Sequence, residues 1–102
     1  ADRAALNRIA AGTQTVTIWK DARELGREAA EIAVRLAGGA RVTEIPNAVQ
    51  WAEGPQRARM TARFLRPVPV TRENLNLVVD AGWAPRAAVC QGVPAGRVGV
   101  CG

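Results

Sequence analysis

A short strand that runs directly into a long helix is the feature that most limits how this chain can fold. Residues 15–39 read TVTIWKDARELGREAAEIAVRLAGG. The β-branched, alternating pattern of residues 13–19 predicts a strand. A helix is predicted to follow, with Asp21 as its N-cap and Gly38-Gly39 as its end. One face of this helix carries the apolar positions 22, 25, 29, 32, 33 and 36. A strand–helix unit of this kind is typical of α/β proteins.

The sequence on either side of this unit predicts shorter elements. Residues 2–11 form a helical pattern that ends at Gly12, with no capping residue expected before its first turn. Residues 40–60 contain Pro46, Gly54 and Pro55, which break any regular pattern, and we predict an irregular segment there.

The remaining part of the chain is preceded and opened by an extended stretch, RMTARFLRPVPVT, which runs from residue 59 to residue 71. Pro67 and Pro69 within it exclude a central position in a hydrogen-bonded sheet. Thr71 is expected to cap a short helix that reaches about Ala81, and Pro85 is expected to open one further helical turn. The tail after this turn is predicted to be a loop.

Only two convincing strands are present in this order of elements, and a sheet of two strands is marginal on its own. We therefore predict an α/β chain that is one part of a larger protein, whose sheet it shares. The absence of an initiator methionine, of a leader and of a bilayer-length apolar run agrees with the expectation of a soluble piece or processed product.

The charge and composition favour binding over catalysis. The formal net charge is +5, but the arginines are scattered among acidic residues, and no basic run alternates with aromatic residues. Nucleic acid is therefore not the expected partner. The chain has no histidine and no tyrosine, and we find neither a phosphate-binding loop nor a nucleophile motif, so no enzymatic activity is predicted.

Cys90 and Cys101 are the only two cysteines. We predict a disulfide between them, which requires an oxidising compartment; two unrelated free thiols are the alternative. Zinc is not expected, since neither a histidine nor a second cysteine pair is available to complete a tetrahedral site, and no cofactor is predicted.

Three further side chains have two interpretations each. Lys20, the only lysine, follows the predicted strand, where ligands of open α/β sheets bind, and its ammonium group has three donors for hydroxyl or carboxylate oxygens. It is otherwise an ordinary surface charge. Trp51 and Trp83 are either stacking platforms for a sugar or anchors of the fold.

Two separated stretches resemble a known family. NRIAAGTQTVTIWKDARELGREAAEIAVRLAGG, followed by FLRPVPVTRENLNLVVDAGWAPRAAVC, is similar to the C-terminal part of the periplasmic D-xylose-binding proteins. These are substrate-binding components of bacterial sugar ABC transporters, of the ribose-binding-like type I class. Residues 40–60, with WAEGPQRAR, depart from the lysine- and asparagine-rich turn of that family.

The resemblance implies two α/β lobes joined by three crossing segments, with a monosaccharide such as xylose bound between them. It implies a partial fold of this type: a strand–helix unit (13–38) of one lobe, an irregular segment (40–60), and a crossing strand with C-terminal elements (61–102) of the other. Lys20 takes the place of a sugar-contacting lysine. The implied location is the periplasm, and the implied partners are the rest of the binding protein and the permease.

Because a specific sugar site needs several converging polar groups, we expect negligible binding of xylose by this chain alone. A small, basic protein that associates with itself through unpaired strands is the alternative function.

Overall fold

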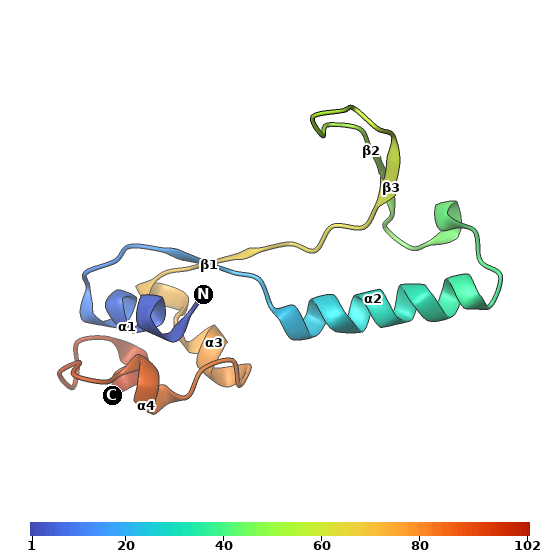
Figure 1. The fold of residues 1–102 in the computed structure, drawn as a ribbon. Helices are drawn as coiled ribbons and strands as arrows, with labels where there is room; N and C mark the ends of the chain where they lie inside the picture. The colour runs from blue at the N-terminus through green and yellow to red at the C-terminus, as the bar shows by residue number, and fades with distance from the viewer. The chain divides into compact units, whose positions relative to one another are not determined.

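The computed structural model describes residues 1–102 and combines helices with short antiparallel strands, which confirms the mixed α/β class (Figure 1). The chain divides into two compact units. The first contains Ala1–Asp21 and Pro67–Gly102, and the second contains Ala22–Arg66. None of the helices has the length and apolar character that a membrane span requires.

The first unit begins with helix α1 (Arg3–Ala11). Gly12 ends it in the left-handed conformation, with φ of 90°, as predicted. The expectation that no residue caps its first turn was wrong. Asp2 has extended dihedral angles, and its Oδ1 atom accepts a 2.6 Å hydrogen bond from the backbone N–H of Ala5. Asp2 thus satisfies one of the donors that every helix start leaves open.

Strands β1 (Thr17–Trp19) and β4 (Val68–Val70) form an antiparallel pair in this unit, with Ile18 opposite Pro69. β1 is shorter than the predicted stretch of residues 13–19. β4 pairs with β1 alone, so its other edge has no partner strand. Pro69 has no N–H group to donate, and it is tolerated because its nitrogen faces that unpaired edge. Its carbonyl oxygen accepts a 3.0 Å hydrogen bond from Nδ2 of Asn74.

Helices α3 (Asn76–Asp80) and α4 (Arg86–Val89) complete the first unit, with 3₁₀ turns at Arg72–Asn74 and Gly99–Cys101. The predicted helix after Thr71 therefore starts as a 3₁₀ turn, and the predicted tail loop contains another. Side chains from α1, β4, α3 and α4 meet in one core, whose largest fully buried members are Leu6, Ile9, Leu75, Val70, Val78 and Val89.

Asn7 links α1 to the end of α4. Its Nδ2 atom donates to the carbonyl oxygens of Val89 at 2.9 Å and Gln91 at 2.8 Å. The first and the last α-helix of the chain are thereby linked within the first unit.

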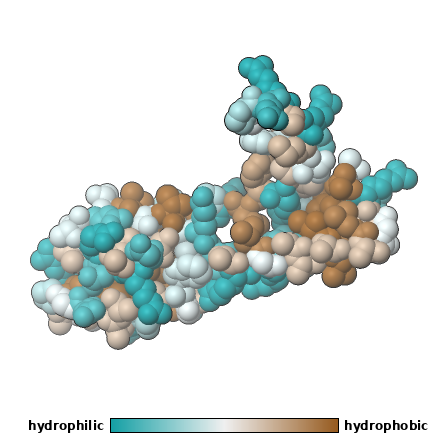
Figure 2. Space-filling view, in the orientation of Figure 1, coloured by the Kyte–Doolittle hydropathy of each residue, from teal (hydrophilic) through white to brown (hydrophobic).

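The second unit contains the predicted long helix, α2 (Ala22–Ala37), which begins after Asp21 and ends before Gly38. None of its residues is buried. Val34 is 72% exposed and Leu25 is 60% exposed, and Figure 2 shows apolar side chains gathered on the surface of this unit. Most apolar positions of this helix are therefore open to solvent within the second unit.

The prediction of an irregular segment at residues 40–60 was partly wrong. After a 3₁₀ turn (Val42–Glu44), β2 (Val49–Trp51) pairs with β3 (Met60–Ala62) in an antiparallel hairpin. Pro46 precedes β2, and Gly54 and Pro55 lie between the two strands, so the residues that break regular patterns fall outside the paired positions.

Candidate ligand-binding site at the end of strand β1

Lys20 lies directly after β1 and two residues before the first residue of α2. Its side chain is exposed. The local order of strand, lysine and helix start is the one expected at the ligand-binding edge of an open α/β sheet. The assignment of Lys20 to a ligand stays a prediction.

Two tryptophans support the end of β1. The rings of Trp19 and Trp83 lie 6.0 Å apart between centroids at an angle of 56°, a tilted packing that aromatic pairs favour. Nε1 of Trp83 also donates a 2.8 Å hydrogen bond to the carbonyl oxygen of Ala1. The amino group of Ala1 in turn donates to the carbonyl oxygen of Ile18 at 3.0 Å. These contacts hold the backbone next to Lys20.

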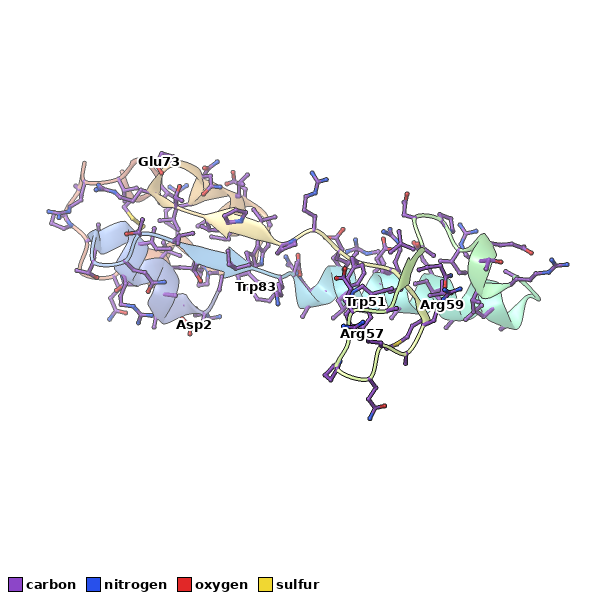
Figure 3. The ribbon with its side chains drawn as sticks, turned by 90° about the horizontal axis from the view of Figure 1, so that it is seen from above. Asp2, Trp51, Arg57, Arg59, Glu73 and Trp83 are labelled. Atoms are coloured by element: carbon purple, nitrogen blue, oxygen red, sulfur yellow. A yellow bond between two sulfur atoms is a disulfide. The ribbon has the colours of Figure 1, made fainter.

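The environments of Trp83 and Trp51 favour their interpretation as anchors of the fold. Trp83 packs against Trp19, as described above, while Trp51 lies edge-on to Phe64 with 6.3 Å between ring centroids. A side chain at Gly54 would place its Cβ atom 3.4 Å from the ring of Trp51, so the hairpin loop folds against that ring. Figure 3 shows Trp51 on the hairpin together with Arg57 and Arg59.

Cys90 and Cys101 form the predicted disulfide, and no cysteine is free. The bond joins the residue after α4 to the C-terminal 3₁₀ turn. Its role is therefore structural and it contributes no thiol chemistry to the strand end.

The acidic side chains of α2 provide no metal site. Glu28 forms an ion pair with Arg63, with 3.1 Å between Oε2 and Nη2. No group of three or more His, Cys, Asp or Glu side chains is placed to hold a metal ion. Residues 28 and 63 are 35 positions apart, and no sequence pattern connects them.

Comparison with known proteins bears on the function of this region. No family model matches the chain. It is 37% identical over 84 residues to the D-xylose-binding periplasmic protein of Escherichia coli (strain K12). The matched region covers 81% of this chain and 24% of the relative. It is 34% identical over 93 residues to the D-xylose-binding periplasmic protein of Haemophilus influenzae (strain ATCC 51907 / DSM 11121 / KW20 / Rd), which covers 87% of this chain and 26% of the relative.

The chain thus spans about a quarter of the length of the curated relatives that it matches. The resemblance predicted from the two sequence stretches is confirmed: over most of its length, this chain is similar to part of the D-xylose-binding periplasmic proteins.

Proposed function

We propose that this chain contributes to the recognition of a xylose-like monosaccharide in the periplasm, as part of the substrate-binding component of a bacterial ABC transporter. The carrying observation is the 34–37% identity to two D-xylose-binding periplasmic proteins over more than four fifths of the chain. The disulfide suits an oxidising compartment such as the periplasm. In this role the chain is a binding module and not an enzyme.

Lys20 is the residue that we propose contacts the sugar. Its ammonium group is exposed at the end of β1, and it offers three hydrogen-bond donors to sugar hydroxyl groups. The neighbouring backbone is held by the packing of Trp19 on Trp83. A fixed strand end that carries a flexible donor is suited to positioning one side of a polyhydroxylated ligand.

The remaining walls of the site come, in this proposal, from other parts of a larger protein. Such a protein has two lobes of the type I periplasmic-binding-protein class, and the proline-containing β4 is its proposed crossing strand. The strand of the 13–38 segment belongs to the first compact unit and its helix to the second. The permease of the transporter is the proposed partner of the complete binding protein.

A chimera tests this proposal. The matched segment of the E. coli D-xylose-binding periplasmic protein is replaced by this chain, and D-xylose binding is measured by isothermal titration calorimetry. We expect the chimera to bind D-xylose and the isolated chain to give no measurable heat. Lys20→Met in the chimera is expected to weaken binding by about tenfold or more, because a hydrogen bond from a charged donor is lost.

Arg86→Gln is the matched control, since Arg86 is another exposed cation of the first unit. It is expected to leave the affinity unchanged. Unchanged affinity of the Lys20→Met chimera would remove Lys20 from the site, and clear binding by the isolated chain would show that no other walls are needed.

Self-association is a second candidate function, and the exposed apolar side chains of α2 favour it. Val34 is 72% exposed on a helix without buried residues. Under this alternative, sedimentation velocity would show a concentration-dependent dimer that Val34→Asp abolishes, because a charge would enter the apolar contact. If the wild-type protein and the Val34→Asp variant are both monomers at all concentrations, self-association is excluded.

A further inference from the structure

A second, polar site lies at the other end of the β1–β4 pair from Lys20. It is a groove with a volume of about 230 Å³, lined by Gly12, Gln14, Thr15, Thr71, Arg72 and Glu73. All six residues belong to the first unit. Thr15 and Lys20 are separated by about 16 Å of extended chain at the usual rise of a strand, so the groove is distinct from the proposed sugar-contacting position.

Arg72 lines this groove, and the guanidinium group of Arg97 lies next to it beside Gly12. A Cβ atom added to Gly12 would lie 3.3 Å from Nη2 of Arg97 and 4.0 Å from Nη1 of Arg72. Arg72 is held in this position because its Nη2 atom donates a hydrogen bond to the backbone carbonyl oxygen of Arg97. The guanidinium groups of Arg97 and Arg72 therefore both lie close to Gly12, one of the residues that line the groove.

A third arginine forms part of the same framework. Nε of Arg8 donates to Oε1 of Gln14 at 2.8 Å, and Nε2 of Gln14 donates to the carbonyl oxygen of Val16 at 2.9 Å. Both ends of the Gln14 amide are thus engaged, which fixes the wall of the groove. These two hydrogen bonds fix the orientation of the Gln14 amide, and the arginines are the charged donors near the groove.

Glu73 is the single acidic group of the groove lining, and it does not balance these charges. Its Oε2 atom accepts a 2.5 Å hydrogen bond from Oγ1 of Thr71. That hydrogen bond, a backbone hydrogen bond and the charge of Arg72 lower the pKa of Glu73, which keeps it ionised at neutral pH. One carboxylate accompanies the three guanidinium groups of Arg8, Arg72 and Arg97, and neither Arg72 nor Arg97 is in an ion pair.

We propose that this groove binds a small oxyanion, of the carboxylate or phosphate type, through the guanidinium groups of Arg97 and Arg72. Guanidinium forks match the planar carboxylate and the phosphate oxygens with two parallel N–H···O bonds. The volume of the groove is below that of typical pockets for drug-sized ligands, which suits a ligand of a few heavy atoms. The hydroxyl group of Thr15 supplies a further donor at its wall.

The isolated chain is the material for the test, since every residue of the groove lies in it. Inorganic phosphate and acetate are titrated separately into the ¹⁵N-labelled protein at constant ionic strength set by chloride. We expect saturable shifts of the amide signals of Gly12 and Thr15 with at least one of the two anions. Saturation by phosphate alone identifies a phosphate site, and saturation by acetate identifies a carboxylate site.

Arg97→Gln is expected to weaken this binding by about tenfold, because a charge-assisted contact is removed. Arg86→Gln, which removes an equal charge elsewhere in the first unit, is expected to have no effect. Circular dichroism confirms that both variants are folded. Shifts that do not saturate with either anion, or equal weakening by both variants, would overturn the proposal.

This outcome is independent of the sugar-binding function. Anion binding is measured on the isolated chain, while D-xylose binding is measured on the chimera. Failure of one experiment leaves the other proposal standing.

Discussion

Leu6→Ala is expected to lower the free energy of unfolding of the first unit by about 2–5 kcal/mol. Leu6 is fully buried, and its side chain belongs to the core cluster that contains Val70, Val78 and Val89. Removing it takes away apolar burial and leaves a cavity where three distant chain segments meet. A unit of this size has little stability in reserve, so the loss unfolds a measurable fraction of molecules.

Urea denaturation followed by tryptophan fluorescence measures this effect, because Trp19 and Trp83 both lie in the first unit. Leu77→Ala is the matched control. Leu77 is also a leucine on a helix of this unit but is 43% exposed, and its truncation is expected to cost well under half as much. Equal losses for the two variants would show that the core is not organised around α1.

The paired substitution of Cys90 and Cys101 by serine is expected to destabilise the same unit by about 3 kcal/mol. The disulfide closes a loop with a sequence separation of 11, and its removal gives the unfolded chain more conformational freedom. The loop also carries Val98, which is 8% exposed and packs into the core. Without the bond, this tail is still tied by the packing of Val98 and by the hydrogen bonds that Asn7 donates to Gln91 and Arg72 donates to Arg97.

Thermal unfolding with and without dithiothreitol provides the measurement. The reductant is expected to lower the midpoint of the wild-type protein to that of the Cys90→Ser/Cys101→Ser variant, and to leave the variant unchanged. A wild-type midpoint that does not respond to reduction would mean that the disulfide contributes nothing to the stability of this unit.

Local signals in the sequence were sufficient for the two longest helices. Gly12 ends α1, and Asp21 and Gly38 bracket α2, because caps and glycines act within a few residues of the helix end. Asp2 was missed as a cap, although its residue type is favoured there. The hairpin of β2 and β3 was missed because each strand has only three residues and a proline-containing loop separates them. An alternation of apolar and polar residues cannot be recognised over so few positions.

The contacts that give the candidate sites their form are long-range and have no sequence signal. Trp19 packs against Trp83, and the guanidinium groups of Arg72 and Arg97 lie beside Gly12. Such pairs are set by the pairing of β1 with β4 and by the position of the tail. The proposal for Lys20 rests on its place after a strand, which is a local feature, and on the family resemblance, which extends over most of the chain.

The first unit is discontinuous, and this has a consequence for how it folds. β1 and β4 pair with each other, yet the whole of the second unit, Ala22–Arg66, lies between them in the chain. Pairing therefore requires closure of a long loop, whose entropic cost grows by about 0.6 kcal/mol for each doubling of its length. Contacts of such high sequence separation form slowly. The cost depends little on what the intervening residues are, so the first unit can accept a different second unit, or a short turn in its place, between the same two strands.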